Sequence, residues 1–195
     1  MFLSNPTKAK IDNEEYLINT DFRVALECNK IGLDTNIGEY EKALAVIYKL
    51  FGNKGLEDTH NHLKLLELGK KYLACGKEET EDNKQEQDMD FEQDYDYIEA
   101  SFMSDYKIDL STIKMHWWTF FNLLNGLSNS ELGSCCILSR IRNLRNYDTS
   151  NIKDTNEKMK IEEMKSKFAL KKRAKVYTPE QLASLEKFNK LTGIS

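Results

Sequence analysis

The chain has 195 residues, of which 40% are hydrophobic and 31% are charged, and its formal net charge is −4. A chain of this length forms one domain, or one domain with an appendage. Nine glycines and two prolines are too few for the many turns of a β-sandwich. The apolar runs are far shorter than the roughly 20 residues that cross a bilayer, and the first ten residues lack a signal peptide's apolar segment. We therefore expect a mainly α-helical, cytoplasmic protein with no membrane partner.

The first 76 residues predict a β-hairpin followed by three helices. Residues 9–11 and 16–18 are apolar segments around a polar turn at 12–15. Residues 19–21 offer a cap for a short helix that Gly32 ends. A third helix begins at Asp58 or Thr59 and ends at Gly76. The second, over 38–51, has apolar residues at three- and four-residue spacing, namely Tyr40, Leu44, Ile47, Tyr48 and Phe51.

Residues 77–92 differ in composition from the rest of the chain and predict a mobile acidic linker. Residues 77–91 read KEETEDNKQEQDMDF, in which Met89 and Phe91 are the large apolar side chains. Such a segment buries too little surface to offset the entropy lost on ordering. We expect a helical region at 1–76 and an aromatic-rich helical region at 93–150 on its two sides, followed by charged C-terminal helices at 151–195.

The region after the linker carries the most aromatic helices of the chain. Tyr95, Ile98, Phe102 and Tyr106 form one helical stripe, and Ser111 is a plausible cap for a helix that ends near Gly126. Further helices are expected from Asn129 or Ser130 to Leu144 and from Asp154 or Thr155 through Leu170. The last begins at Thr178-Pro179, a capping signal with Gln181 three residues on, and its apolar stripe is Leu182, Leu185, Phe188 and Leu191.

Candidate catalytic and metal-binding residues are few. His60 and His62 point to different sides of a helix and read as exposed histidines at a helix start. His116 lacks a nucleophile at a suitable spacing, and the acidic stretch 86–96 lacks the glycine of a calcium loop. The four cysteines form no C-x-x-C pair and read as reduced, buried thiols. We expect no enzyme activity, no cofactor and no metal.

Charge is distributed unevenly along the chain. Residues 76–109 carry 3 basic and 13 acidic groups, whereas residues 110–195 carry 15 basic and 8 acidic groups. This separation of acidic and basic segments suits a protein that contacts different surfaces, or other copies of itself. It equally fits two segments that are simply exposed to solvent. The basic run 165–175 could touch phosphates, but the acidic pI of about 5.5 argues against nucleic acid as a partner.

The adjacent tryptophans suggest a partner-binding surface. Trp117 and Trp118 diverge by about 100° around a helix, so they cannot share one stripe. One is expected in the core, and the other packs a second layer or anchors a partner. The candidate partner-binding residues are Tyr95, Ile98, Phe102, Trp117, Trp118 and Phe121.

Three segments resemble the bacteriophage gp-fifteen family of tailed phages and prophages of Gram-positive bacteria. They are INTDFRVAL at 18–26, DYDYIEASFMSDYKIDL at 94–110 and HWWTFFNLLNGL at 116–127. The resemblance extends from the hairpin to about Leu144, and this chain departs from it in the acidic linker and in Cys135-Cys136.

Genes of this family lie between the major tail protein and the tape measure protein. The resemblance therefore implies a tail assembly chaperone that binds the tape measure protein, with the major tail protein and further copies of itself as additional partners. A structural tail or baseplate component of the virion is the alternative, and a nucleic-acid-binding regulator is a weaker one.

Overall fold

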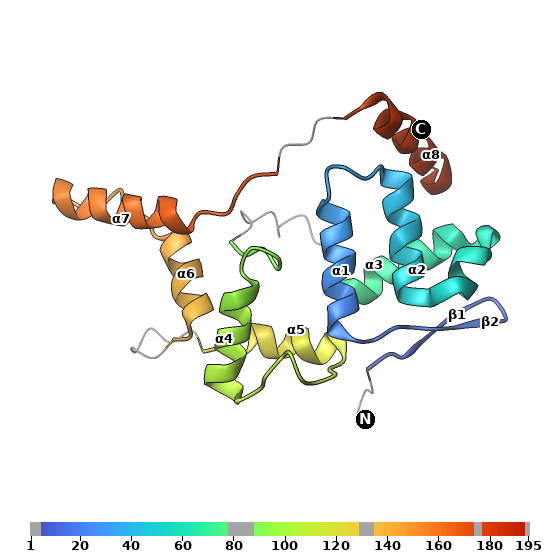
Figure 1. Ribbon diagram of the computed structural model, residues 1–195, viewed down its shortest axis with the longest axis horizontal. Coiled ribbons are helices and arrows are strands. Elements are labelled where there is room, and N and C mark those ends of the chain that lie inside the picture. Colours follow the sequence, from blue (N-terminus) through green and yellow to red (C-terminus); the bar gives the residue numbers. More distant parts are fainter. Residues whose placement is uncertain (1–4, 78–87, 129–134, 174–176, 194–195) are drawn as a thin grey trace. The chain divides into compact units, whose positions relative to one another are not determined.

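The computed structural model describes residues 5–77, 88–128, 135–173 and 177–193. About 62% of the described residues are helical, and these residues form eight α-helices and one two-stranded hairpin. The mainly α fold with an N-terminal hairpin is thus confirmed (Figure 1). The chain divides into two compact units: residues 1–81, 114–122 and 173–195 form unit 1, and residues 82–113 and 123–172 form unit 2. The linker residues 78–87 and the cap predicted at Asn129 or Ser130 lie outside the described residues.

Unit 1 begins with the hairpin, whose alternating residues enter the core. Strand β1 (Lys8–Ile11) pairs antiparallel with β2 (Glu14–Leu17). Ile11 and Tyr16 are buried, whereas Leu17 points to the other face and is 69% exposed. The Tyr16 hydroxyl donates a hydrogen bond to Asp58, which fixes the hairpin against the loop after the second helix.

Three helices follow the hairpin: α1 (Phe22–Leu33), α2 (Glu39–Glu57) and α3 (His62–Leu73). Helix α2 packs against β2 and α3 against β1, while α1 packs against α2. Asp21 caps α1 through the Arg23 N–H, as the sequence predicts. Helix α2 continues six residues beyond the predicted end at Phe51, although Gly52 adopts φ +67° and kinks it. A 3₁₀ turn, η1 (Thr59–Asn61), precedes α3.

Two later segments complete unit 1. The first is the N-terminal part of α5 (Trp117–Asn125), and Phe120 on it stacks on Phe22 with ring centroids 4.6 Å apart. The second is α8 (Pro179–Thr192), which packs against α2 and α3. Its predicted capping box is present, because Gln181 N–H donates to Thr178 Oγ1 and Thr178 N–H donates to Gln181 Oε1.

The start predicted for α5 at Ser111 is wrong. Ser111 instead donates to Asp109 in a turn. Residues 115–117 pair with residues 20–22 at the start of α1, since Phe22 N–H donates to Met115 O and Trp117 N–H donates to Thr20 O. These long-range backbone bonds hold the chain extended up to His116, so the helix begins at Trp117.

Unit 2 contains α4 (Tyr95–Tyr106), the C-terminal end of α5, α6 (Ile137–Asn146) and α7 (Thr155–Phe168). Ile98 and Phe102 of α4 and Leu138 and Ile141 of α6 are buried, and the two helices pack together. Asp154 caps α7 as predicted, through the N–H groups of Asn156 and Glu157. Asp88 and Asp90, at the end of the predicted linker, take part in this unit: Asp88 pairs with Arg142, and Asp90 is buried.

Candidate partner-binding surface

Both tryptophans donate hydrogen bonds to the C-terminal end of helix α3. Trp117 is 4% exposed, and its indole N–H donates to Leu73 O at 3.0 Å. The Trp118 indole N–H donates to Tyr72 O at 2.9 Å. The last carbonyls of a helix have no partner within the helix. Two consecutive indoles from α5 therefore satisfy two consecutive carbonyls of α3.

Trp118 packs as a second layer rather than standing free in solvent. Its ring lies 6.2 Å from that of Tyr72, measured between centroids, and 6.4 Å from that of His116. Gly76, at φ +72°, passes close to the indole, and a Cβ at this position would lie 3.2 Å from Trp118 Cη2. Trp118 is half-buried.

The six predicted partner-binding residues are divided between the two units. Trp117, Trp118 and Phe121 belong to unit 1, and Tyr95, Ile98 and Phe102 belong to unit 2. Ile98, Phe102 and Trp117 are buried, so their side chains serve the cores. Tyr95, Trp118 and Phe121 are half-buried, and the Lys77 ammonium lies 5.4 Å from the centre of the Phe121 ring.

His116 and His62 have structural roles. His116 Nδ1 accepts a hydrogen bond from Trp118 N–H at the start of α5, and its Nε2 lies 3.0 Å from Pro6 O. A ring that accepts at Nδ1 can donate through Nε2 to Pro6 O. His62 is buried, with Nε2 2.9 Å from Leu56 O, so the expectation of an exposed histidine at this position is wrong. In the described parts of the chain, no group of three His, Cys, Asp or Glu side chains could hold a metal.

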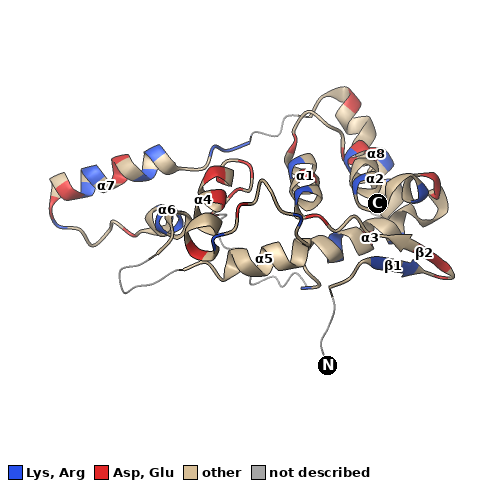
Figure 2. Cartoon of the chain, turned by 60° about the horizontal axis from the view of Figure 1, so that its bottom comes forward, with Lys and Arg blue, Asp and Glu red and all other residues tan. Residues whose placement is uncertain are grey.

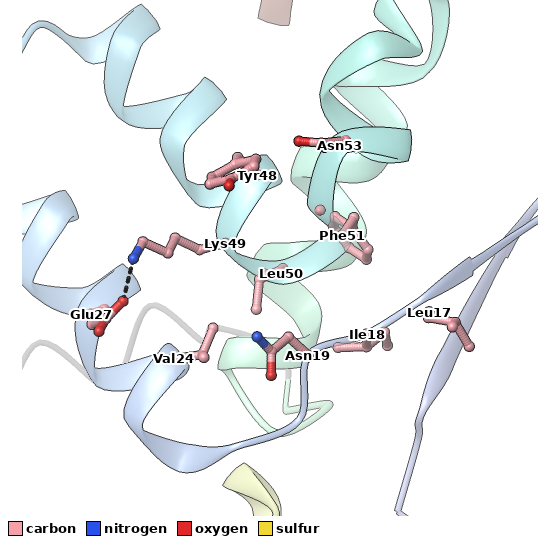
Figure 3. Close-up of a pocket in the computed structure, with 11 residues that line it drawn as sticks. Leu17, Ile18, Asn19, Val24, Glu27, Tyr48, Lys49, Leu50, Phe51 and Asn53 are labelled. Atoms are coloured by element: carbon pink, nitrogen blue, oxygen red, sulfur yellow. Dashed lines mark hydrogen bonds and ion pairs between the residues drawn. The ribbon is translucent and has the colours of Figure 1, made fainter.

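A groove in unit 1 exposes apolar side chains that sequence reasoning placed elsewhere (Figure 3). We call it the kink groove; its volume is about 580 Å³, and it lies between the end of β2, α1 and the kink of α2. Leu17 is 69% and Tyr48 is 47% exposed. Its lining includes Leu17, Ile18, Val24, Glu27, Tyr48 and Lys49.

The groove lies at the kink of α2, where Gly52 has φ +67°. Just before this kink, Leu50 O accepts a hydrogen bond from Asn19 N–H at 2.8 Å. The chain after β2 is thereby fixed beside α2. On one side of the groove, Lys49 Nζ lies 2.6 Å from Glu27 Oε2, and this hydrogen bond raises the pKa of Lys49. The groove thus joins apolar side chains with one ion pair.

Sequence reasoning missed both exposed residues for identifiable reasons. Tyr48 was assigned to the buried face of α2, but Ile47 and Leu50 fill that side. The signal for Leu17 was available: in a strand, neighbours alternate between faces, so a buried Tyr16 places Leu17 outside.

Unit 2 also exposes apolar side chains, along α7. Met159 is 65% and Met164 is 45% exposed, and none of the residues of α7 is buried. Lysines and glutamates alternate with them along the helix (Figure 2). Methionine is flexible and polarizable, so it adapts to varied apolar partners.

No helix among the described residues is long and apolar enough to cross a membrane. No curated protein and no solved structure matches the chain. The family described as Bacteriophage Gp15 protein matches residues 4–170, a span that ends before the last segment of unit 1, residues 173–195. The chain therefore belongs to the bacteriophage Gp15 protein family, which points to a structural or assembly-related protein of a phage.

Proposed function

We propose that this protein is a non-enzymatic tail assembly chaperone that binds the tape measure protein in the cytoplasm of the bacterial host. Membership of the phage family supports a role in phage structure or assembly. The observation that favours assembly is the kink groove, where Leu17 and Tyr48 remain exposed beside the Glu27–Lys49 ion pair. The chaperone leaves before the virion is complete.

The chemistry of the groove fits a helix of the tape measure protein. Such a protein is a long helical chain with apolar stripes, and it must stay soluble until tail tube subunits polymerise around it. An amphipathic helix binds a groove through side chains at i, i+3 and i+4. Leu17 and Tyr48 would contact the apolar stripe, and Glu27 and Lys49 would contact the polar flank.

Co-expression tests the chaperone function. The tape measure protein alone should aggregate, and co-expression with this chain should keep it soluble. Replacement of Tyr48 by Asp should abolish this protection, because it places a charge in the groove. Met103, on α4, is similarly exposed at 44%, so Met103→Asp is the matched control and should protect like the wild type.

The alternative, a structural tail or baseplate component, makes a different prediction. A chaperone is absent from purified virions, whereas a structural component is recovered from them in fixed stoichiometry. Mass spectrometry of purified virions distinguishes the two. Stoichiometric recovery of this chain from intact tails would contradict the chaperone function.

A further inference from the structure

The backbone groups of Lys8 and Lys10 lie on an outer edge of the hairpin. In an antiparallel pair, alternate residues exchange hydrogen bonds with the partner strand, and the residues between them point their N–H and C=O groups away from it. Ile18 N–H donates to Thr7 O at 2.9 Å, which fixes this alternation. Counting from this bond, the backbone of Ala9 faces β2, whereas that of Lys8 and that of Lys10 face outward.

The outer edge of β2 is occupied, whereas that of β1 is open. On β2, Lys54 Nζ donates to the outward carbonyl of Glu15 at 2.9 Å and also pairs with Glu14. Within the described residues, no hydrogen bond reaches the outward N–H and C=O groups of Lys8 and Lys10. An open edge of this kind can accept a further strand through main-chain hydrogen bonds.

A groove lies beside this open edge, and we call it the edge groove. Its volume is about 400 Å³, and its lining comes from β1, the hairpin turn and α3, which packs against β1. Because β2 contributes nothing to the lining, the groove is on the open side of the hairpin. Ile11 and the half-buried Leu68 give it an apolar part. The lining residues are Lys10, Ile11, Asp12, Lys64, Glu67, Leu68 and Lys71.

The edge groove is basic, and β1 itself carries lysines (Figure 2). Lys10, Lys64 and Lys71 line it, against Asp12 and Glu67. Lys64 Nζ lies 2.7 Å from Asp12 Oδ2, so these two charges offset each other. In the part of the chain that the structure describes, neither Lys10 nor Lys71 pairs with a carboxylate. The groove therefore favours an occupant with negative charge.

The lysines of β1 argue against a second copy of this chain as the occupant. Pairing of two β1 strands would bring Lys8 and Lys10 of one copy opposite those of the other, and like charges that face each other destabilise a strand pair. Strand β2 shows the partner that these lysines accept. Glu15 lies opposite Lys10 in the register, and its Oε1 is 2.8 Å from Lys8 Nζ.

We propose that the open edge of β1 binds an extended acidic segment of a partner protein as a third strand. Main-chain hydrogen bonds to Lys8 and Lys10 supply affinity, and the side chains of the added strand alternate between its two faces. Carboxylates on one face meet Lys8 and Lys10, whose neighbours Ala9 and Ile11 are buried on the other face. Apolar side chains on that face enter the edge groove beside Leu68.

The segment recognised in this way alternates acidic and apolar residues. The edge groove shares no lining residue with the kink groove, so the proposal stands or falls independently of the chaperone function.

Titration of the full-length protein with two synthetic peptides tests the proposal. Each has about ten residues, the upper length of an ordinary strand. Glutamate alternates with valine in the first, and lysine alternates with valine in the second. The Glu-Val peptide should bind and protect the amides of Lys8 and Lys10 from hydrogen exchange, whereas the Lys-Val peptide should not bind. Absence of binding by the Glu-Val peptide, or equal binding by both peptides, would overturn the proposal.

Two variants separate the contribution of the backbone from that of charge. Lys10→Pro removes an N–H that faces outward, so the hydrogen bonds to β2 remain. It should weaken binding of the Glu-Val peptide by at least about tenfold. Lys71→Glu reverses a charge of the groove and should weaken binding about fivefold at low ionic strength. Lys190, on α8, is exposed and does not line the groove, so Lys190→Glu is the matched control and should bind like the wild type.

Hydrogen exchange at Ala9, whose N–H faces β2, shows whether Lys10→Pro keeps its hairpin; if it does not, Lys71→Glu alone decides the result. Unchanged affinity in Lys71→Glu, or in Lys10→Pro with an intact hairpin, contradicts the added strand. A wild-type protein whose mass doubles in light scattering, and returns to that of one chain in Lys10→Pro, also contradicts it, because a second copy then occupies the edge.

Discussion

Arg145 and Asp94 form a bidentate ion pair inside unit 2, with both nitrogen–oxygen distances at 2.7 Å. The side chain of Asp94 is 1% exposed and that of Arg145 is 10% exposed. The same guanidinium donates to Asp88 O and to Phe168 O. One side chain of α6 thus joins the segment before α4 to the end of α7.

Replacing Arg145 by Met should lower the free energy of unfolding by about 3–5 kcal/mol, because it leaves Asp94 buried without its partner. Arg142→Met on the same helix is the control. Its pair with Asp88 has side chains 38% and 26% exposed, so the loss should stay below about 1 kcal/mol. Urea denaturation measures both values. Equal losses for the two variants would contradict the central role of Arg145.

The two tryptophans should contribute unequally to stability. Trp117→Ala should cost about 3–5 kcal/mol, because it empties a buried site. Trp117→Phe keeps an aromatic ring but removes the indole N–H that donates to Leu73 O. It should lower the free energy of unfolding by about 1 kcal/mol. Trp118→Ala should cost less than Trp117→Ala, since Trp118 is half-buried. Thermal or urea denaturation of the three variants checks this order, and a larger loss for Trp118→Ala would refute it.

Asp105 should make stability depend on pH below about pH 4. Its carboxylate accepts Ser128 N–H at 2.8 Å, and this bond lowers its pKa below the ordinary 3.8. A lowered pKa in the folded state adds stability above the ordinary value, and that stability is lost as the pH falls through the folded pKa. Asp105→Asn should therefore show a shallower loss of stability from about pH 5 to about pH 3. Urea denaturation at each pH measures the free energy of unfolding. The same pH dependence in Asp105→Asn and the wild type would contradict this prediction.

Two thiols should react slowly in the folded protein. Burial raises the pKa of Cys28 to about 12 and that of Cys75 to about 11, so little thiolate forms at about pH 8. A thiol reagent should label both faster in urea than in native buffer. Cys28→Ser and Cys75→Ser assign the signals. Native labelling of Cys28 at the unfolded rate would show that its site is open.

Local signals in the sequence predicted local structure well. The Thr178 capping box, the Asp154 cap and the hairpin all depend on residues a few positions apart, and the structure contains each of them. Ser111 failed as a cap because pairing of His116 with Asp21, distant in the sequence, holds the chain extended. Ser184 Oγ accepts an N–H at the start of α2 but gave no signal as a cap, since this helix begins 145 positions earlier.

The candidate site was less predictable than the fold. The aromatic stripes identified Ile98, Phe102 and Trp117, but these are buried, because the largest apolar side chains usually form the core. The kink groove depends on Gly52, a helix breaker that directly follows the predicted end at Phe51, but the sequence does not show that the helix resumes beyond it. The exposure of Tyr48 became visible only once the helix was placed, whereas strand alternation already indicated that of Leu17.

The most direct test of the proposed function is the affinity of this chain for a soluble helical segment of the tape measure protein, measured by calorimetry. The wild type and Met103→Asp should bind alike, and raising salt should weaken binding little, because the contact is mainly apolar. Tyr48→Asp should weaken binding by at least about tenfold, the equivalent of about 1.4 kcal/mol. Equal affinity for Tyr48→Asp and the wild type, or no binding by the wild type, would contradict the kink groove as the site of tape measure recognition.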